Sequence, residues 1–563
     1  MPRESASPTS IDIAGLLAGL LSFASSAPFS ILRPTNIDWL LGEDPAVSYL
    51  GWEFFRRDDW RIPFGLNPTF GLELSSSIVF TDSLPLLAFP AKFLTSHAEA
   101  PIQYFGIWIL FCFLAQGLFA SKIAFRLGHK LSACLLLSVL LCLLPFHLTR
   151  LNYGYGHLAL FAHFLILSAI YLAMRPAAFS PVAWILLLST ALLTMAYLFL
   201  IVLVIFLAAC LQEVRLHGIK SSFVAYVGLT AVWLAVCAYL IGYFATSSDS
   251  LLVGYGSYNA HPSSLFSPQA RGGIFWSYLL AQNGAGGALH GDGEGFAFIG
   301  LGALALVLLS CAMLARGQVE RSLRKHLGPR SGEHGAFDKP LLWASVVLAY
   351  LSLARNVPLN GYQIPIPTPL IFDDILSRFR SNGRLLWPLA YLLIFSASHV
   401  IRRAQRRVIV LVLTAATCLQ MADTTEARKL MKDKLEIGYN PSSSMEPKIA
   451  EAVRLSSSNI QSLRVFPPTA TPEYDWASLA LAGLRNSLAT GAFTVSRVNE
   501  NQNTSELTLS EYLRAHEDHS IIVTESFSNL ELDHPYIQNT WGTIEAGEHL
   551  ILYPRRDGSG YSR

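Results

Sequence analysis

The apolar stretch from Pro181 to Cys210, PVAWILLLSTALLTMAYLFLIVLVIFLAAC, decides the topology of this chain. As one helix it would be about 45 Å long, well beyond the roughly 30 Å hydrocarbon core of a bilayer. A tight hairpin near Met195-Ala196-Tyr197 divides it into two spans and gives about eleven membrane-spanning helices in all. They are predicted at residues 11–32, 102–121, 131–147, 154–173, 181–195, 197–213, 222–244, 297–315, 340–356, 385–401 and 408–421.

Composition supports a polytopic membrane protein. The chain is 52% hydrophobic and 14% charged, against roughly 25% charged residues in soluble domains. The net charge of +2 gives no information about a nucleic-acid partner, and no basic stripe with interleaved aromatic residues predicts one. The cysteines fall in apolar spans without metal-type spacing and are predicted to be packing residues. The first span has no strong basic segment before it, so we expect a retained helix rather than a signal peptide.

Basic residues between the spans predict the orientation. With the amino terminus in the cytoplasm, the predicted inner loops hold the excess of lysine and arginine that the positive-inside rule requires. Reading 181–213 as one helix would move the last two basic loops to the opposite face. The outer face then receives the loop 33–100, the turn at Arg150, the loops 245–296 and 357–384, and the region from Ala422 onward.

The expected fold class is therefore an α-helical polytopic membrane protein with a carboxyl-terminal periplasmic α/β domain. Residues 1–421 are predicted to form the membrane domain, with 33–100 as an acidic outer loop, and residues 422–563 the outer domain. That outer region is richer in charge, and its patterns predict two helices and four strands. The helices are expected at 447–455 and 509–516, and the strands at 463–466, 492–498, 520–524 and 549–553.

The first outer loop carries a cluster of acidic and aromatic residues, in DWLLGEDP (38–45) and GWEFFRRDDWR (51–61). Carboxylates beside a membrane are costly to desolvate, so such a cluster indicates chemistry or ligand binding. Asp44 is the candidate general base, although an Asp before Pro45 can also simply cap a helix. The neighbouring side chains predicted to contact substrate are Trp52, Arg56 and Arg57.

Asp82 is the second acidic candidate. It lies in the apolar, proline-interrupted segment SSIVFTDSLPLL (76–87), which predicts an interfacial or re-entrant helix pair. A carboxylate in such a segment indicates function. The alternative is that Asp82 caps the helix beginning at Leu84-Pro85.

Cations at the outer face are candidates for phosphate binding, because a guanidinium group forms bidentate contacts with phosphate. Anchoring to lipid headgroups explains each arginine equally well, and a lone histidine near a helix start is more often structural. The residues assigned to phosphate binding are Arg150, His157, Arg380 and Arg384.

The glycine-rich outer loop 245–296 follows no strand, so it is neither a dinucleotide fingerprint nor a Walker loop. We expect a mobile lid over a substrate cleft, and we assign Tyr255 and Glu294 to substrate binding. His290, Asp292 and Glu294 leave a divalent cation possible, although their spacing matches no strong metal signature. No cofactor is otherwise predicted.

On these motifs the chain resembles the GT-C-type membrane glycosyltransferases. More narrowly, it is similar to a bacterial family of polytopic proteins catalogued only as a domain of unknown function. The resemblance rests on Trp39–Asp44, GWEFFR (51–56), WRIPFG (60–65), TDSLP (81–85), Gly156-His157 after Arg150, and SNGRLLWP (381–388).

The superfamily implies a polyprenyl-phosphate-linked sugar donor and an inverting displacement at the periplasmic face of the bacterial inner membrane. An acid of the first outer loop would act as base, and basic residues would hold the donor phosphate. By position, Asp44 matches the base, Asp82 a second acid near the acceptor, and Arg150 and Arg384 the phosphate ligands. Because the superfamily often shows paired adjacent acids, Glu43, Asp44 and Asp82 all stay open as the base.

The leading functional hypothesis is a glycosyltransferase that moves a sugar from a lipid phosphate onto a glycan or lipid acceptor. The alternatives are a transporter or flippase of lipid-linked sugars and a non-catalytic scaffold that binds envelope glycan. The sequence shows no internal repeat and few charges within the spans, features that transporters commonly have.

Overall fold

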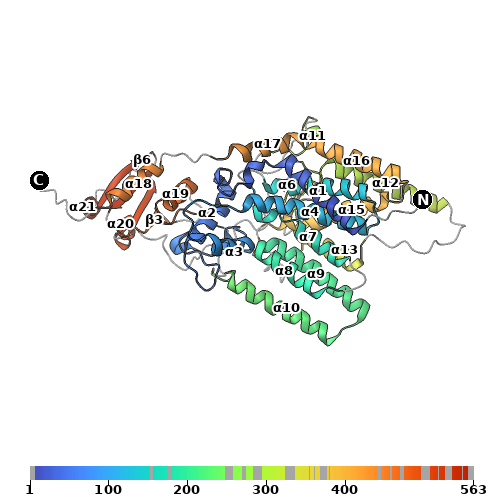
Figure 1. The fold of residues 1–563 in the computed structure, drawn as a ribbon, viewed down its shortest axis with the longest axis horizontal. Coiled ribbons are helices and arrows are strands. Elements are labelled where there is room, and N and C mark those ends of the chain that lie inside the picture. The colour runs from blue at the N-terminus through green and yellow to red at the C-terminus, as the bar shows by residue number, and fades with distance from the viewer. Residues whose placement is uncertain are drawn as a thin grey trace. The chain divides into compact units, whose positions relative to one another are not determined.

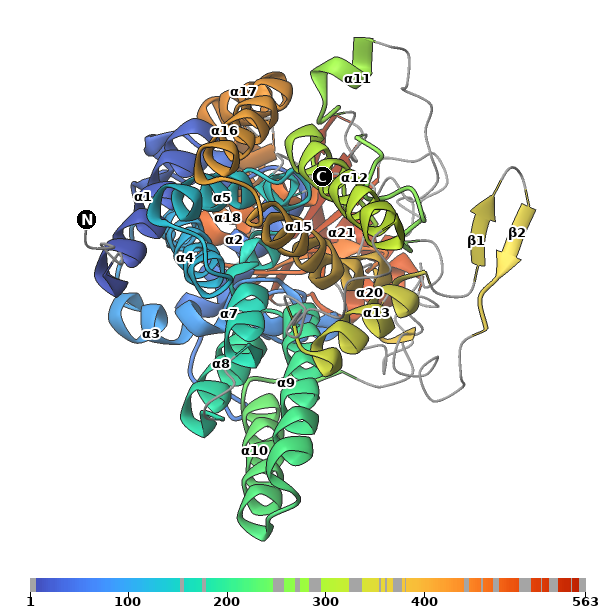
Figure 2. The same cartoon turned by 90° about the vertical axis from the view of Figure 1, so that its right-hand side faces the viewer.

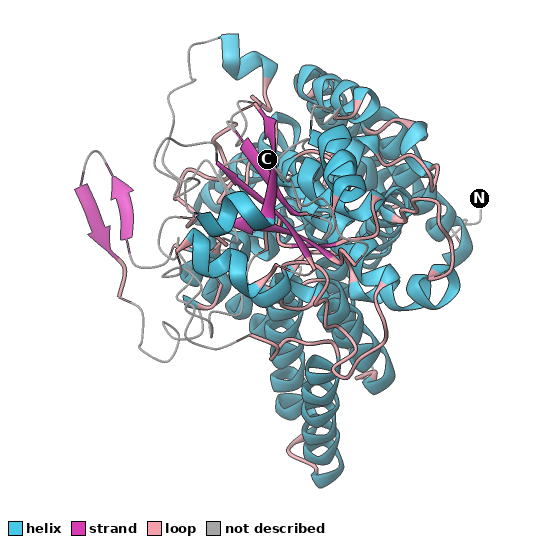
Figure 3. Cartoon of the chain, turned by 90° about the vertical axis from the view of Figure 1, so that its left-hand side faces the viewer, coloured by secondary structure: helices cyan, strands magenta, loops and turns pink. Residues whose placement is uncertain are grey.

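A computed structural model of the chain is mostly helical and contains two small sheets (Figures 1 and 3). The chain divides into two compact units. Unit 1 comprises residues 1–33, 104–234 and 251–436, and unit 2 comprises residues 34–103, 235–250 and 437–563. The residues that the structure describes are 7–151, 156–174, 179–246, 258–268, 274–282, 295–323, 337–353, 356–359, 362–367, 377–379, 381–439, 445–456, 459–468, 475–495, 508–517, 519–525, 535–547 and 549–555.

Unit 1 is a bundle of apolar helices with one β-hairpin, formed by the antiparallel strands β1 and β2 (Figure 2). Its elements are α1 (Pro8–Ser26), α4 (Phe105–Arg126), α5 (Leu131–Cys142), α6 (Pro145–Leu148), α7 (Phe164–Ala173), α8 (Pro181–Thr194), α9 (Ala196–His217), the start of α10 (Ser221–Leu240), α11 (Tyr278–Gln282), α12 (Leu301–Leu323), α13 (Lys339–Ser352), β1 (Asn356–Leu359), β2 (Tyr362–Pro365), the 3-10 helix η8 (Asn382–Leu386), α15 (Trp387–Ile401), α16 (Arg406–Asp423) and α17 (Thr425–Ile437).

Glycine allows α1 and α4 to pack at very short range. A Cβ atom on Gly15 or Gly19 would lie 2.7 Å or 2.3 Å from a main-chain oxygen of α4. The two glycines are four residues apart and therefore share one helix face, as in the small-residue interfaces of membrane helices. Ser121 adds a hydrogen bond of 2.8 Å to the carbonyl of Ile11.

Gln420 fixes the start of α12 from the neighbouring helix α16. Its Oε1 accepts the N–H groups of Gly302 and Ala303 at 3.0 and 3.3 Å. Its Nε2 donates to the carbonyls of Leu143 and Ile299 at 3.1 and 3.2 Å. One buried amide thus satisfies main-chain groups from two other segments, which would otherwise be costly to bury.

The predicted break in the stretch 181–210 is confirmed. Helix α8 ends at Thr194 and α9 begins at Ala196, because Met195 has extended backbone angles. The two helices lie side by side (Figure 1). A continuous helix of that length would project beyond the apolar layer, so the break is the expected solution.

Each of the predicted spans contains a helix in the described residues, but fewer meet the length of a full crossing. Among the described residues, five helices are long and apolar enough to cross a membrane, or up to seven if each of two bent pairs counts as one span. The remaining segments form apolar helices of 10–17 residues. The number of eleven crossings stays a prediction.

Unit 2 contains a five-stranded mixed sheet in the order β4-β3-β5-β7-β6. Strand β3 is parallel to β4 and β5, while β7 is antiparallel to β5 and β6. Apolar side chains of the sheet and of α18 and α19 form a buried core. The elements of this unit are α2 (Glu43–Arg57), the 3-10 helix η4 (Ile78–Phe80), α3 (Pro85–Thr95), α18 (Met445–Leu455), β3 (Ser462–Phe466), α19 (Trp476–Arg485), β4 (Ala489–Thr490), α20 (Leu509–Ala515), β5 (Ser520–Glu525), α21 (Pro535–Thr540), β6 (Trp541–Ala546) and β7 (His549–Pro554).

The predicted elements of the outer region are largely confirmed, with one correction. Both helices and the strands at 463–466, 520–524 and 549–553 form. The strand at 492–498 is wrong over 492–495, since pairing ends at Thr490, whose Oγ1 accepts the N–H of Ala492 at 3.0 Å. Helices α19 and α21 and strands β4 and β6 were not predicted.

The first outer loop, grouped with the membrane region by sequence, folds with the carboxyl-terminal region in unit 2. Glu73 receives a 2.6 Å ion pair from Arg464 and a 3.1 Å hydrogen bond from Tyr512. The main chains of Thr69 and Thr490 are joined by a hydrogen bond of 2.8 Å. These partners of Thr69 and Glu73 lie more than 350 positions later in the chain.

Candidate functional site

The acidic candidates Glu43 and Asp44 lie in the first turn of α2, where main-chain N–H groups and the helix dipole favour negative charge. The helix begins two residues earlier than the sequence predicts, with Gly42 at the N-cap, so Asp44 is not the N-cap residue. Glu43 is exposed and Asp44 is half-buried. Glu43 also has a φ of 48°, an unusual backbone conformation for a side chain of this kind.

The turn that carries Asp82 is fastened to the face of α2. The Ser83 hydroxyl donates to the carbonyl of Ser48 at 2.7 Å and lies 2.7 Å from the Thr81 hydroxyl. A Cβ atom on Gly51 would come within 2.6 Å of Thr81, so the turn fits only against a glycine. Ser48 lies one helical turn after Asp44, a rise of about 6 Å. Asp44 and the turn that carries Asp82 are therefore both positioned by α2.

Backbone strain marks the same turn. Asp82 and Leu84 have φ angles of 55° and 53°, the left-handed region that non-glycine residues seldom occupy. Each such residue costs on the order of 1–3 kcal/mol and persists only where its surroundings hold it. Leu84, not Asp82, occupies the N-cap position of α3, and Asp82 itself is half-buried.

Two of the predicted substrate contacts are structural instead. Trp52 is fully buried and its Nε1 donates to the carbonyl of Ile102 at 2.8 Å. Arg56 is also fully buried, 2.6 Å from Glu53, and donates to the carbonyls of Thr95, Ala98 and Ala100. Neither side chain has exposed surface with which to contact a substrate; together they close the segment 95–102 onto α2.

Arg57 lies at the last turn of α2 and keeps an exposed side chain. Its guanidinium donates to the carbonyls of Glu99 and Leu484 at 3.3 and 3.4 Å. These bonds join the first outer loop to α19, so Arg57 has a structural role within unit 2.

Lys92 on α3 is a residue that sequence reasoning missed. Its ammonium nitrogen lies 4.0 Å from the ring centre of Phe55 and 4.7 Å from that of Trp60. Burial lowers the pKa of Lys92 to about 8, against an opposing effect of Asp58 and Asp59. A cation of lowered pKa between aromatic rings is typical of functional sites. A lysine within the apolar run LLAFPAKFL (86–94) was the available signal.

In unit 1 the structure brings the segments of Arg150 and Arg384 to one tryptophan. The guanidinium carbon of Arg150 lies 5.2 Å from the ring centre of Trp387. Arg384 belongs to η8, which runs directly into Trp387 at the start of α15. Its guanidinium carbon lies 4.3 Å from the ring centre of Tyr197. Both arginines are buried, with 3% of their surface exposed.

Two histidines, not predicted from sequence, accompany these arginines. The rings of His163 and Trp387 have centres 4.2 Å apart, and those of His147 and His163 are 5.0 Å apart. His163 Nδ1 lies 3.0 Å from the hydroxyl of Tyr391, which also accepts a hydrogen bond from Gln116 at 2.9 Å. Histidines in apolar segments on both sides of Arg150 were the sequence signal, since such residues are rare within spans.

Several buried polar atoms beside these arginines have no hydrogen-bond partner in the described part of the chain. They are Nδ2 and Oδ1 of Asn382, Nε1 of Trp387 and Nε2 of His163. Buried polar groups are nearly always paired, with protein, water or ligand. These polar groups beside two arginines have the chemistry to bind a polar, anionic ligand.

Of the remaining predicted residues, His157 alone lies in the described part of the chain. His157 is half-buried at the N-cap position of η6 (Leu158–Phe161), without a side-chain capping bond. Arg380, Tyr255 and Glu294 lie outside the described residues, as do His290 and Asp292. Within the described ranges, no three His, Cys, Asp or Glu side chains are grouped to hold a metal ion.

The apolar helices define a helical membrane protein. Residues 16–425 match the family described as Domain of unknown function (DUF6311), and the chain belongs to that family. The expectation of a family catalogued in this way is thereby confirmed. A search of the curated proteins finds no match.

Among solved structures, the chain is similar to the oligosaccharyltransferase of Archaeoglobus fulgidus in its apo form, with a TM-score of 0.41 and 12% identity over 93% of this chain and 70% of that one. The same archaeal enzyme in complex with an inhibitory peptide and a dolichol-phosphate gives a TM-score of 0.41 and 12% identity, over 91% and 69%. These values are too low to transfer a site, which rests on the chain's own residues.

Proposed function

We propose that this protein is a membrane glycosyltransferase. It moves a sugar from a polyprenyl-phosphate-linked donor to a hydroxyl of a glycan or lipid acceptor at the outer face of the bacterial inner membrane. The observation that carries the proposal is the fastening of the Asp82 turn onto α2 by the 2.7 Å bond between Ser83 and Ser48, one turn beyond Asp44. Two half-buried carboxylates on one rigid framework suit proton removal from an acceptor and its orientation.

In the proposed reaction the acceptor oxygen attacks the anomeric carbon of the donor sugar. Its proton passes to a carboxylate, for which Asp44 is the first candidate and Asp82 and Glu43 are alternatives. The bond between the anomeric carbon and the phosphate oxygen breaks, and polyprenyl phosphate leaves with the electron pair. Because attack comes from the opposite side, the anomeric configuration inverts.

Arg150 and Arg384 are assigned to the donor phosphate. Guanidinium groups stabilise the negative charge that develops on a leaving phosphate, and the effect is greatest where water is excluded. Their burial and the unpaired atoms of Asn382, Trp387 and His163 support this assignment. The carboxylates belong to unit 2 and the arginines to unit 1. The role of each group is inferred from contacts within its own unit.

The proposal is tested by following release of polyprenyl phosphate from a donor pool in liposomes that contain the purified chain and a membrane extract as acceptor source. This product is formed whatever the acceptor is. We expect Asp44→Asn to lower the release rate by roughly 10²–10⁴-fold, the usual contribution of a general base. Donor binding should persist. Asp59→Asn, an exposed carboxylate of the same loop, serves as the matched control.

Other outcomes assign other roles. Loss of turnover in Asp82→Asn or Glu43→Gln, with Asp44→Asn active, would move the base to that residue. Donor binding by the wild type without release of polyprenyl phosphate, together with movement of the lipid-linked sugar across the bilayer, would establish the transporter instead. Full release of polyprenyl phosphate by all three variants would exclude these acids as the base. A wild type that binds envelope glycan, releases no polyprenyl phosphate and moves no donor would establish the scaffold.

A further inference from the structure

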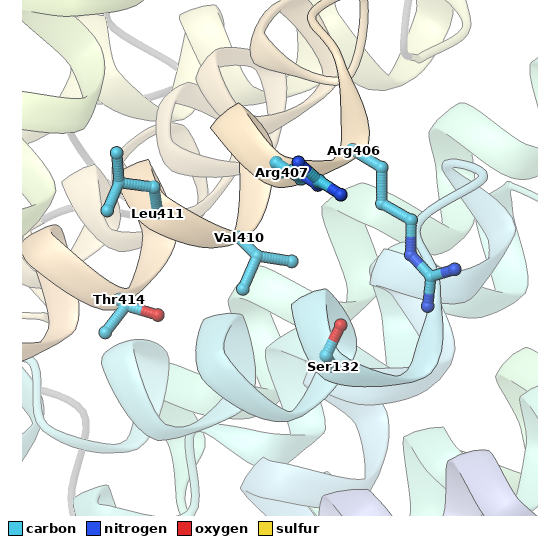
Figure 4. A pocket seen from close by; sticks show the side chains of 6 residues that line it. All are labelled: Ser132, Arg406, Arg407, Val410, Leu411 and Thr414. Atoms are coloured by element: carbon cyan, nitrogen blue, oxygen red, sulfur yellow. The ribbon is translucent and has the colours of Figure 1, made fainter.

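A pocket of about 560 Å³ lies between the start of α5 and the start of α16 in unit 1. Neither Arg150 nor Arg384 is among the residues that line it. It is lined by Ser132 of α5 and by five residues of α16: Arg406, Arg407, Val410, Leu411 and Thr414. Figure 4 shows Arg406 extending from the start of α16 towards α5, while Val410 points into the space between the helices. The pocket is open to its surroundings.

One end of this pocket is strongly cationic. Arg406 and Arg407 are both exposed, and no hydrogen bond or ion pair engages either guanidinium in the described part of the structure. The sequence from 375 to 422 contains no Asp or Glu, and neither does the sequence from 100 to 212, which includes α5. The N–H groups at the start of α16 add positive potential. The charge at this end therefore complements an anion.

The other end of the pocket is apolar. Leu411 is 69% exposed, and Val410 lies one turn after Arg406 on the same side of the helix. Beyond them Thr417 donates to the carbonyl of Leu136 at 3.3 Å, which ties α16 to α5. From Arg406 to Thr414 the helix rises about 12 Å. This length accommodates a phosphate headgroup and the first part of an acyl chain.

We propose that this pocket binds an anionic glycerophospholipid, whose phosphate contacts Arg406 and Arg407 and whose acyl chain lies along Val410 and Leu411. Basic pockets between membrane helices bind such headgroups in other proteins, and arginine suits phosphate because its donors form a planar fork. The hydroxyls of Ser132 and Thr414 offer hydrogen bonds to the glycerol and ester oxygens. The proposal is independent of the glycosyl-transfer reaction.

The test is a lipid titration of the purified full chain in detergent, with bound lipids counted by native mass spectrometry. Phosphatidylglycerol and phosphatidylcholine with identical acyl chains are compared. We expect the anionic lipid to bind at least about tenfold more tightly. The double variant Arg406→Gln/Arg407→Gln should lower its affinity to that of phosphatidylcholine, whereas Arg406→Lys/Arg407→Lys should retain most of the preference.

The matched control removes two exposed positive charges beside another pair of helices, with Arg215→Gln/Lys220→Gln. This control should keep the preference, and thermal stability should be alike in all variants. Leu411→Asn should weaken both lipids, because it removes apolar contact with the acyl chain.

Equal affinity of the two lipids, or an unchanged preference in the Arg406/Arg407 glutamine variant, would overturn the proposal. Displacement of the lipid by millimolar inorganic phosphate would show a simple anion site instead. Tighter binding of polyprenyl phosphate than of phosphatidylglycerol would reassign the pocket to the donor lipid.

Discussion

The hydroxyl of Ser83 donates a 2.7 Å hydrogen bond to the main-chain carbonyl of Ser48. This bond joins the strained turn of Asp82 to the helix whose first turn carries Asp44. The carbonyl of Gly51 on the same helix accepts a 2.9 Å bond from Asn67. Main-chain carbonyls of α2 thus hold two other segments of the loop 33–100. The same helix carries Asp44 and binds the turn that carries Asp82.

Gly51→Ala should displace the turn that carries Asp82 from helix α2. The added Cβ would lie 2.6 Å from Cβ and Oγ1 of Thr81, so the Asp82 turn must shift. We expect a loss of about 1–3 kcal/mol in the free energy of unfolding and a lower rate of polyprenyl phosphate release. Gly228→Ala, in a helix where a Cβ meets nothing within 4 Å, is the control. An unchanged rate in Gly51→Ala would mean that the turn does not position a reacting group.

Arg150→Gln and Arg384→Gln should each weaken donor binding by roughly 10–100-fold, as expected for loss of a charged hydrogen bond. The measurement is a titration with a short-chain polyprenyl phosphate. Arg215→Gln, an exposed arginine at the end of α9, should bind like the wild type. Because both arginines are buried, thermal unfolding of each variant must be compared with that of the wild type. Unaltered affinity in a folded variant would exclude that arginine from the phosphate site.

Glu53→Gln should destabilise the protein strongly. Glu53 and Arg56 are completely buried and 2.6 Å apart, and Glu53 also accepts bonds from Tyr49 and the N–H of Ile102. Removal of the carboxylate charge leaves a buried guanidinium without its ionic partner, which costs about 3–5 kcal/mol.

The control for this variant is Glu446→Gln, which breaks an exposed pair with Arg485 and should cost at most about 1 kcal/mol. Thermal melts of the detergent-solubilised variants provide the comparison. Equal melting temperatures would show that the Glu53 pair adds no more than a surface contact.

Lys92 should make stability depend on alkaline pH. Its pKa falls from 10.5 in the unfolded chain to about 8 in the folded protein, mainly through burial. Between these values the unfolded state holds the extra proton, so stability increases as the pH rises from about 8 to 10.5. The gain should be on the order of 1–3 kcal/mol. Lys92→Met should flatten this rise in melting temperature, whereas the exposed Lys429→Met should not; a flat wild-type profile would contradict the lowered pKa.

Local pattern predicted much of the secondary structure. The helices around 447–455 and 509–516 and three of the strands follow from the periodicity of apolar residues, which depends only on near neighbours. The break at Met195 follows from the length of the apolar stretch relative to the bilayer and from the positions of the basic loops. Helix α19 was missed although Asp475 caps it by accepting the N–H of Ser478 at 3.2 Å. Its run WASLALAGL (476–484) contains no charged residue, so no charged face marks it in the sequence.

Some residues of the candidate site could also be predicted from the sequence, and others could not. Asp44 and Asp82 were recognisable because carboxylates in apolar surroundings are costly. The structural roles of Trp52 and Arg56 were not recognisable in the sequence. Their partners are main-chain carbonyls of the segment 95–102, and the side chains of that segment do not indicate such bonds. Nor could spacing show that Arg150 and the His163 ring both lie beside Trp387.

The sequence by itself determined that this is a helical membrane protein with an acidic segment after its first apolar helix and a charged carboxyl-terminal region, because hydrophobicity and charge are properties of the residues. Tertiary structure alone decided that the loop 34–103 folds with residues 437–563, through contacts such as Glu73 to Arg464 at 2.6 Å. Pairing of distant segments depends on how whole surfaces fit after the chain has folded, and no local pattern of side chains specifies that fit.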